Sequence, residues 1–356
     1  MTLRVAQVAS GREWRGGQRQ VWLLARALAR RGTVDQVVVT GRGSELARRL
    51  VADGVPLLAP GWRSAYDPRA LLAACRAAHR HGIVHAHDSH ALTLAWVAAR
   101  LTGAHLVATR RVDFAVRGPG LWARADRVIA ISAAVRDALV AGGVPAHRIA
   151  LVHSGIDVDA MARTPRHDPR PGLGLAAGTP LAITTGALVG HKDHATLLRA
   201  AARAAATRPD LHWVIAGEGA LRPRLEQLAA ELGVAGRVHL PGHVPDAEAL
   251  VGAADLFVMS SREEGLGTAV LNAMALGVPV VATGAGGIPE MLAGGAGRLV
   301  HVGDAEALAG AVVETLADAS ARARMVAAAR EAVRRFSDER MAEGVLQVYR
   351  SLVPVL

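Results

Sequence analysis

Short apolar, β-branched runs alternate with alanine-rich amphipathic segments along the whole chain, a pattern that predicts strands followed by helices. In the first half, such runs predict strands at residues 3–9, 36–40, 83–87, 105–109, 127–131 and 149–153. A second series begins near Leu181 and continues at residues 211–216, 237–240, 256–260 and 278–282. Because hairpin signals are few, we expect each series to form a doubly wound, parallel α/β sheet.

Two domains are expected, because 356 residues exceed what one hydrophobic core usually supports. Residues 163–174 are rich in Pro, Gly and Arg and predict a linker between the domains. We therefore expect a first domain at 1–165, a second at 166–336, and a final helix within 337–356 that packs back on the first domain. Two such domains would face each other across a cleft at the carboxyl ends of their strands.

The composition narrows the class of protein. Hydrophobic residues make up 51% of the chain and aromatic residues only 3%, so the cores are built from Ala, Val and Leu. Cys75 is the only cysteine, which excludes an internal disulfide and fits a reducing cytoplasm. The longest uncharged stretch, residues 268–289, contains Gly277 and Pro279 and therefore predicts helix, strand and loop, not a membrane span. The first ten residues lack the apolar core of a signal peptide.

The net charge of +10 is concentrated in the first half, where residues 1–165 carry 23 arginines against 11 acids. Such a domain could face nucleic acid, an anionic membrane or an anionic substrate. The arginines are dispersed and lack aromatic interleaving, which argues against nucleic acid. Residues 44–52 and 68–80 predict helices with one apolar and one basic face, which favours a membrane surface. A solvated, arginine-rich surface is the alternative.

Two strand-to-helix junctions have features of phosphate-binding loops. Lys192, the only lysine, follows an apolar strand in a turn that contains Gly186 and Gly190 and leads into a helix. The first N–H groups of a helix favour an anion, and lysine adds a mobile point charge. In the first such junction, Gly16 and Gly17 would let backbone N–H groups approach a phosphate. Chance placement is the alternative for the lysine.

Two further junctions place polar side chains at strand ends. His85 and His87 lie on one face of a predicted strand and could orient a sugar or move a proton. A metal site is the competing interpretation there, although no third ligand cluster is apparent. Arg110, Arg111 and Asp113 follow the next strand, either as a clamp for an anion or hydroxyl, or as a buried ion pair.

The fourth junction carries the most specific pattern. After a strand, Glu264 precedes Gly265-Leu266-Gly267, which opens a helix. This S-x-x-E-G-L-G sequence resembles the retaining GT-B glycosyltransferases of family 4, whose signature has a second acid eight positions after the first. The resemblance covers nearly the whole chain and includes the glycine pair of the first junction and the lysine segment. It also includes V-H-A-H at 84–87, A-D-R-V-I-A-I-S at 125–132, S-G-I-D at 154–157, A-G-E-G at 216–219, G-H-V at 242–244 and G-G-I-P-E at 286–290.

The resemblance implies a GT-B fold of two Rossmann-like domains and a role for each matching residue. Lys192 would neutralise the donor diphosphate as the glycosidic bond breaks, and Glu264 would accept hydrogen bonds from the donor sugar. His87 completes the expected catalytic group. The expected donor-binding residues are Gly16, Gly17, Gly186, Gly242, His243, Val244, Gly265, Leu266, Gly267, Thr268 and Asn272. The expected contacts to acceptor or sugar are His85, Arg110, Arg111 and Asp113. No metal or other cofactor is expected.

Three positions depart from the family pattern. Position 187, usually an arginine that pairs with the lysine, is Ala187. The second acid of the signature is Asn272, whose amide offers one acceptor and two donors where a carboxylate offers only acceptors. A histidine often found after the T-x pair is replaced by Arg111.

The function implied by the resemblance is transfer, with retention, of a hexose or heptose from a nucleotide diphosphate sugar. The acceptor would be a hydroxyl of a saccharide or lipid-linked molecule in bacterial envelope polysaccharide or lipopolysaccharide synthesis. We expect a cytoplasmic enzyme of class EC 2.4, peripheral on the inner face of the plasma membrane, with no nucleic-acid partner. Ala187 and Asn272 motivate the alternative of a non-catalytic protein that binds a nucleotide sugar or another anion.

Overall fold

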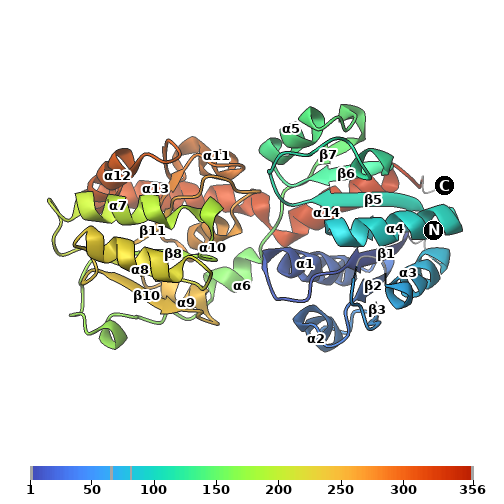
Figure 1. Ribbon diagram of the computed structural model, residues 1–356, viewed down its shortest axis with the longest axis horizontal. Helices are drawn as coiled ribbons and strands as arrows, with labels where there is room; N and C mark the ends of the chain where they lie inside the picture. Colours follow the sequence, from blue (N-terminus) through green and yellow to red (C-terminus); the bar gives the residue numbers. More distant parts are fainter. Residues whose placement is uncertain (1–2, 65–66, 81, 354–356) are drawn as a thin grey trace. The chain divides into compact units, whose positions relative to one another are not determined.

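The computed structural model describes residues 3–64, 67–80 and 82–353. The chain divides into two compact units (Figure 1). Unit 1 contains the chain up to Asp157 together with the segment from Phe336 onward, and unit 2 contains Val158–Arg335. The chain therefore leaves unit 1 once and returns to it near its end.

Unit 1 is built on a seven-stranded sheet in which every pair of neighbouring strands is parallel. Its strands are β1 (Leu3–Ala9), β2 (Val34–Thr40), β3 (Leu57–Leu58), β4 (Ile83–Ala86), β5 (His105–Arg110), β6 (Arg127–Ala130) and β7 (Ile149–Leu151). They lie in the order β3-β2-β1-β4-β5-β6-β7, so the order reverses between β1 and β4. Ligands bind at the carboxyl ends of strands beside such a reversal.

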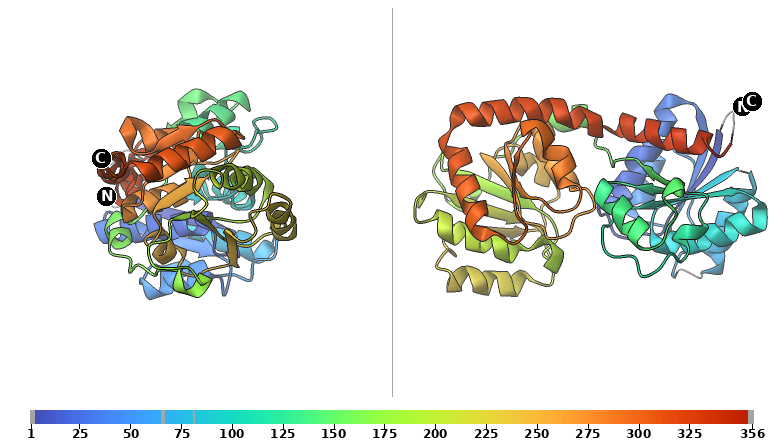
Figure 2. Two further views of the ribbon diagram at one scale, coloured as in Figure 1. Left: turned by 90° about the vertical axis from the view of Figure 1, so that its left-hand side faces the viewer. Right: turned by 90° about the horizontal axis from the view of Figure 1, so that it is seen from above.

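The helices of unit 1 are α1 (Gly16–Arg31), α2 (Glu45–Ala52), α3 (Pro68–Arg80), α4 (Ser89–Thr102), α5 (Ala133–Ala141) and α14 (Asp338–Arg350). Helices α1 and α14 share one core with the sheet, in which Leu28, Ile129 and Leu346 are buried. Figure 2 shows α14, the last red helix, among the blue and cyan elements of unit 1. Gly155 permits this return, because a Cβ there would lie 2.6 Å from the carbonyl oxygen of Ser337.

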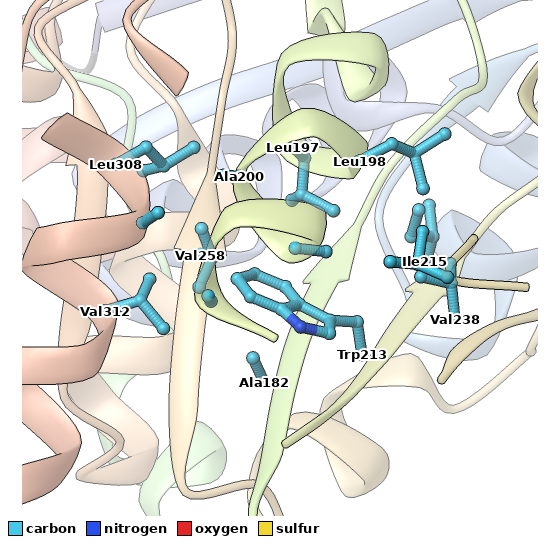
Figure 3. Packing of buried hydrophobic residues seen from close by; sticks show 14 of the residues in the cluster. Ala182, Leu197, Leu198, Ala200, Trp213, Ile215, Val238, Val258, Leu308 and Val312 are labelled. Carbon is cyan, nitrogen blue, oxygen red and sulfur yellow. The ribbon is translucent and has the colours of Figure 1, made fainter. Parts of the chain in front are cut away.

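Unit 2 contains a six-stranded parallel sheet in the order β10-β9-β8-β11-β12-β13. Its strands are β8 (Leu181–Thr185), β9 (His212–Ala216), β10 (Val238–Gly242), β11 (Leu256–Met259), β12 (Val280–Thr283) and β13 (Arg298–Val300). Its helices are α6 (Val158–Ala162), α7 (His194–Ala204), α8 (Arg222–Glu231), α9 (Ala247–Val251), α10 (Thr268–Leu276), α11 (Ile288–Leu292), α12 (Ala305–Ala317) and α13 (Ala319–Val333). Trp213 packs among aliphatic side chains of the sheet, α7 and α12 (Figure 3). Here the order reverses between β8 and β11.

The prediction of two parallel, doubly wound sheets is confirmed, with small differences at the sheet edges. The short strands β3 and β13 were not predicted, since two and three residues show no periodicity. Strand β7 ends at Leu151, two residues before the predicted end. None of the helices in the described part of the chain combines the length and apolarity that a bilayer span requires.

The prediction of an interdomain linker at residues 163–174 is wrong. Arg170 is 7% exposed, and its guanidinium donates to Asp255 at 2.7 Å and to the carbonyl of Thr179 at 2.7 Å. A further hydrogen bond joins the guanidinium to Asp168 at 2.9 Å. Because these bonds fasten the Pro- and Gly-rich segment to unit 2, the segment belongs to that unit, and the chain crosses at Asp157.

Helix α4 offers a matched pair of substitutions that tests the packing of unit 1. Leu94 is 2% exposed, whereas Leu101, in the same helix, is 71% exposed. We expect Leu94→Ala to lower the free energy of unfolding by about 2–5 kcal/mol, because it leaves a cavity in the core. Leu101→Ala should change it by about 0.5 kcal/mol or less. Urea denaturation measures both, and equal effects of the two variants would contradict the packing described.

Candidate functional site

Two loops at the strand-order reversal of unit 2 carry a charged pair. Lys192 follows β8, and Glu264 follows β11, and the Nζ of the lysine forms an ion pair with Oε2 of the carboxylate. Their side chains are 18% and 15% exposed, so both are reachable from solvent. Ser261 also donates to Oε2 of Glu264, at 3.3 Å. The structure thus brings together two residues, 72 positions apart, that the sequence predicted as site residues.

The turn that presents Lys192 is held by side chains of the second loop. Ser260 Oγ donates to the carbonyl oxygens of Lys192 and Asp193, at 3.1 and 3.0 Å. Asp193 has a positive φ of 46°, which is uncommon for a residue other than glycine. Its Oδ2 accepts from Thr196 Oγ1 and from Arg262 Nε, each at 2.7 Å. Sequence reasoning missed Asp193 and Ser260, although an aspartate directly before a helix is a recognisable N-cap signal.

The loop after β8 rests against the A-G-E-G segment at 216–219. A Cβ at Gly217 would lie 1.8 Å from the carbonyl oxygen of Gly186, and one at Gly219 would lie 2.4 Å from that of Leu188. Only glycine therefore allows this backbone contact. Gly186 in turn lies beside Lys192, whose Cε is 3.7 Å from the position of a Cβ on that glycine. Ala187, where the family has arginine, is exposed.

The second loop of the site continues into α10 through buried glycines. Gly267, with a φ of 95°, is the N-cap of α10, and Met291 and Ile288 lie 3.1 and 3.2 Å from where its Cβ would be. Leu266 is only 2% exposed, because its side chain belongs to the core. What this segment can offer a ligand is therefore backbone N–H groups at a helix N-terminus, with Thr268 at the first helical position.

Asn272, in the second turn of α10, has an unusual environment. Its Nδ2 donates to Glu248 Oε1 at 3.2 Å, and its Oδ1 is buried and accepts no hydrogen bond from any described residue. A buried acceptor without a donor is costly in a folded protein, so it indicates a place where a ligand hydroxyl can donate. Glu248, on α9, adds a carboxylate next to this amide, and sequence reasoning missed it.

The G-H-V segment lies at the end of β10, at the edge of the same sheet. Gly242 is buried with a φ of 85°, and Oε1 of Glu218 lies 2.5 Å from where its Cβ would be. His243 is exposed, and Val244 is half-buried. Strand β9 lies between β10 and β8 in the sheet. Glu218, in the A-G-E-G segment after β9, has its side chain beside Gly242 and accepts at its carbonyl from the N–H of Leu188, in the loop that leads to Lys192.

In unit 1, a chain of polar side chains runs inward from the strand-order reversal. Arg111 Nη2 lies 3.1 Å from His87 Nδ1, and His87 Nε2 lies 2.9 Å from Gln7 Oε1. Gln7 Nε2 donates to Gln36 Oε1, and Gln36 Nε2 donates to the carbonyl of Ala25, each at 2.6 Å. Because a guanidinium can only donate, His87 accepts at Nδ1 and carries its proton on Nε2. This row of hydrogen-bonded side chains therefore fixes both the tautomer of His87 and the orientation of Arg111.

Burial keeps these groups in defined charge states. Burial, with smaller contributions from His85 and Arg111, holds the pKa of His87 well below its usual value. Burial also lowers the pKa of Arg111, to about 10, which leaves the guanidinium charged at neutral pH. His87 is 4% exposed with both ring nitrogens bonded inside the protein. These bonds suit a residue that positions Arg111, and the catalytic role expected for His87 stays a prediction.

His85 is a core residue, and the expectation that it contacts a sugar is wrong. It is 0% exposed, and its ring nitrogens are hydrogen-bonded to Tyr349 Oη and Thr109 Oγ1, each at 2.7 Å. Burial, and then the charge of Arg111, lowers its pKa to about 3. The ring centroids of His85 and His87 lie 4.1 Å apart, which fits two side chains on the same side of the chain. His85 thus fastens β4 to α14 and β5.

The two arginines after β5 have different roles. Arg110 is 8% exposed, donates to the carbonyl of Phe114 and lies 5.4 Å from the ring centroid of Trp122, so it holds the loop that contains Asp113. Arg111 instead points to His87 and to Ser154 Oγ, at 3.4 Å. Arg110 is buried and Arg111 is half-buried, so Arg111 is the better placed of the two to contact a ligand.

The glycine pair lies at the start of α1, beside Arg111. Apart from its neighbours along the chain and the backbone of its own helix, no described atom lies within 4 Å of where a Cβ on Gly16 would be. On the same basis, the nearest atom to such a Cβ on Gly17 is Cδ of Arg111, at 4.0 Å. The loop that precedes them begins at Ser10, whose N–H and Oγ both donate to Asp88. The same carboxylate caps α4 by accepting from the N–H of Ala91 at 2.9 Å. The structure therefore brings Gly17 and Arg111 together at the carboxyl ends of β1 and β5.

No group of three or more His, Cys, Asp or Glu side chains that could hold a metal ion occurs among residues 3–64, 67–80 and 82–353.

Comparison with protein families gives two matches that together cover most of the chain. Residues 166–332 match the model of glycosyl transferases group 1, and residues 14–160 match glycosyltransferase family 4. The D-inositol 3-phosphate glycosyltransferase of Rhodococcus opacus is 30% identical over 299 residues, which cover 76% of this chain and 67% of the relative. The lipopolysaccharide core biosynthesis glycosyltransferase LpsE of Rhizobium meliloti is 37% identical over 185 residues, covering 51% of this chain and 53% of LpsE.

The chain spans about half the length of several of these curated relatives, with 53%, 55% and 51% of three of them matched. Among solved structures, Anabaena HepE in complex with UDP and glucose superposes with a TM-score of 0.84 at 21% identity, covering 98% of this chain and all of HepE. That likeness concerns the fold. The named relatives are transferases, which argues against the alternative of a non-catalytic binding protein.

The buried histidines predict a pH dependence of stability. Because the folded-state pKa of His85 and His87 lies below the unfolded value of about 6.5, the unfolded chain binds more protons once the pH falls below that value. We expect the free energy of unfolding to fall below pH 6.5 by up to about 1.4 kcal/mol per pH unit for each such histidine. Urea denaturation at pH 7.5 and 5.5 measures this, and His85→Gln should flatten the slope. A His85 ring signal in NMR that titrates near pH 6.5 would contradict the burial described.

Proposed function

The chain belongs to the glycosyl transferases group 1, and its residues 14–160 match glycosyltransferase family 4, so we propose that it is a retaining glycosyltransferase. It transfers a hexose or heptose from a nucleotide diphosphate sugar to a hydroxyl of a saccharide or lipid-linked acceptor. LpsE, named for lipopolysaccharide core biosynthesis, supports a role in envelope glycan synthesis. HepE, which binds UDP and glucose, supports a nucleoside diphosphate sugar as the donor.

The observation that carries the proposal is the ion pair between Lys192 and Glu264 at the strand-order reversal of unit 2. In the free protein, each group neutralises the other. A nucleotide sugar offers both of them a better partner, since its diphosphate attracts the ammonium and its sugar hydroxyls donate to the carboxylate. Binding of the donor therefore separates the pair and turns two mutually neutralised charges into two substrate contacts.

Lys192 then acts on the leaving group. As the bond between the anomeric carbon and the diphosphate oxygen breaks, negative charge grows on the diphosphate, and a fixed ammonium stabilises it without a metal. The N–H groups of Gly265, Leu266 and Gly267, at the N-terminus of α10, add to this stabilisation. Without an arginine at position 187, Lys192 carries most of this electrostatic work.

Glu264 supports the sugar while it is positively charged. A carboxylate that accepts from sugar hydroxyls favours the oxocarbenium-like transition state. The acceptor oxygen forms its bond to the anomeric carbon on the face that the diphosphate leaves, and its proton passes to a phosphate oxygen of the departing nucleoside diphosphate. No enzyme side chain has to serve as general base, which fits the position of His87 beneath Arg111.

The nucleoside binds along α10 and the end of β10. Oδ1 of Asn272 accepts from one ribose hydroxyl, and Glu248 supplies the carboxylate that the family signature places at position 272. Backbone groups of Gly242, His243 and Val244 contact the base. In unit 1, Gly16 and Gly17 serve the donor, and Arg111 serves the acceptor or sugar.

The test is turnover on a panel of UDP-, GDP- and ADP-sugars with EDTA present, comparing wild type with Lys192→Ala and Glu264→Ala. We expect one donor to be hydrolysed or transferred, and each variant to lose about 10²–10³ in kcat, because one preorganised electrostatic contact is removed. Activity in EDTA that both variants lose would identify the donor and the two residues together.

Matched controls separate the loss of these groups from a general loss of charge. Glu263, the exposed neighbour of Glu264, and Arg199, an exposed cation on α7, provide them as Glu263→Ala and Arg199→Ala. Both controls should keep activity within about twofold of wild type. Binding of every nucleotide without turnover by the wild type would refute the transferase assignment.

We also propose that the protein works in the cytoplasm at the inner face of the plasma membrane. Helices α2 and α3 expose Val51 at 65% and Leu72 at 52% beside the exposed arginines Arg48, Arg76 and Arg80. A helix with an exposed apolar side chain and a basic rim suits the surface of an anionic bilayer.

Vesicle sedimentation tests this location. We expect binding to vesicles with phosphatidylglycerol, weaker binding at high salt, and little binding to phosphatidylcholine alone. Replacing Arg76 and Arg80 by Glu should weaken binding about tenfold or more, at about 1 kcal/mol for each arginine near the surface. The control Arg117→Glu/Arg136→Glu makes the same charge change elsewhere in unit 1. Equal sedimentation with both kinds of vesicle would refute the membrane proposal.

A further inference from the structure

A basic cavity of unit 1 lies apart from the glycine pair and Arg111. It has a volume of about 510 Å³ and is lined by Arg12, Arg42, Arg63 and Arg69, together with Trp62 and Ser44. The arginines come from the loops that follow β1, β2 and β3 and from the start of α3, beside α2 (Figure 1). The cavity therefore lies at the carboxyl edge of the sheet, where ligands of this architecture bind. We call it the arginine cavity.

The charge of the arginine cavity is offset only in part, through the electrostatic interaction of Asp67 with Arg69. Within the described chain, no acidic side chain lines it. Glu45, in the first turn of α2, is instead paired with Arg48 and Arg49, the latter at 2.8 Å. Asp67 accepts from the backbone N–H groups of Arg63 and Arg69, each at 2.9 Å, so it shapes the loop. Four guanidinium groups around one cavity repel one another, and an anion removes that repulsion.

The cavity is also held open in a defined shape. Arg12 Nη2 donates to the carbonyls of Trp62 and Arg63, at 2.8 and 3.0 Å, and joins the loop after β1 to the loop after β3. Trp62 is 7% exposed, and its Nε1 donates to the carbonyl of Ser64 at 2.9 Å. Ser44 caps α2 by accepting from the N–H of Ala47 at 3.1 Å. The described residues around the cavity are therefore held by hydrogen bonds of the protein itself.

A second cavity, of about 450 Å³, adjoins the first and shares Arg12, Trp62 and Arg63 with it. It extends to Ser10 and His90, at the carboxyl end of β1 and the start of α4. That is the strand-order reversal of unit 1, where Arg111 and Gly17 also lie. A molecule whose anionic group lies in the arginine cavity can thus extend its uncharged portion through the second cavity toward the strand-order reversal between β1 and β4.

We propose that the arginine cavity binds a phosphoryl group of the acceptor, so that the acceptor is a phosphorylated saccharide or a saccharide linked through phosphate. The inference rests on the proposed transferase function and names the class of acceptor. Guanidinium groups match phosphate oxygens through paired N–H donors, and four of them suit a phosphoryl group better than a neutral sugar. The donor diphosphate has its own binding groups in unit 2, at Lys192 and Gly265–Gly267.

The direct test is isothermal titration of the whole protein with inorganic phosphate at constant ionic strength. We expect one site in the wild type and at least tenfold weaker binding in Arg42→Ala/Arg63→Ala/Arg69→Ala. Arg12 is left in place because it holds the loops together. The control Arg48→Ala/Arg117→Ala/Arg136→Ala removes the same charge elsewhere in unit 1 and should bind phosphate within twofold of wild type. Absence of phosphate binding by the wild type, or equal weakening in both variants, would overturn the proposal.

A second titration compares a hexose 6-phosphate with the same hexose. The wild type should prefer the phosphate ester at least tenfold, and the triple variant should lose that preference. If the triple variant does not keep the thermal unfolding midpoint of wild type, the single variant Arg69→Gln replaces it, with an expected loss of at least threefold. An unchanged preference in a folded variant would overturn the proposal.

A third measurement distinguishes the acceptor from the donor as the source of the phosphate. Titration with UDP and hydrolysis of the donor by water should be unchanged in the triple variant, because neither uses the acceptor. A tenfold loss of UDP affinity would assign the arginine cavity to the donor and overturn the proposal. A protein without turnover on any donor, yet with phosphate binding that depends on these arginines, would refute the transferase function separately.

Discussion

Everything that positions the site depends on one constraint of the parallel sheet. Parallel strands all point the same way, so their carboxyl ends, and the loops that follow them, collect at one edge. Where the strand order reverses, between β1 and β4 in unit 1 and between β8 and β11 in unit 2, neighbouring loops leave in opposite directions. The space they leave is where Lys192 meets Glu264, and where Arg111 meets Gly17. Close backbone contacts at Gly217 and Gly219 then fix the loops themselves.

The two units use charge in different ways. In unit 2 the ammonium of Lys192 and the carboxylate of Glu264 are paired, and a single substrate that offers both a phosphate and hydroxyls can separate them. In unit 1, Arg111 is held by a row of histidine and glutamine side chains, and the four arginines of the arginine cavity surround a space that no acidic side chain of the described residues lines. The first arrangement suits a ligand that must react. The second suits one that must only be held.

Some interpretations of the sequence were wrong for a common reason. The prediction that the rings of His85 and His87 lie on the same side is supported, although β4 ends at Ala86. That side is covered by α14 and by the side chains hydrogen-bonded to His87, which no periodicity reveals. The Pro- and Gly-rich segment has the composition of a linker, yet the buried guanidinium of Arg170 fastens it to unit 2. In each case a partner distant in sequence decided the role of the residue. At Asn272, where the sequence lacks the second acid of the family signature, the structure places the carboxylate of Glu248 at 3.2 Å from the amide.

The sequence by itself determined the elements and the family, because strand and helix periodicity, glycine positions and the E-G-L-G junction are local. It also singled out candidate junctions, since glycine, histidine and charged residues between a strand and a helix stand out from the apolar runs around them. Only the tertiary structure decided which of those residues are buried and which are reachable from solvent. Burial and hydrogen-bond partners come from segments such as α14 and α9, which lie far along the chain from the strands and helices they contact. The arginine cavity is the clearest instance, because Arg12, Arg42 and Arg69 share no motif and meet only when three parallel strands end side by side.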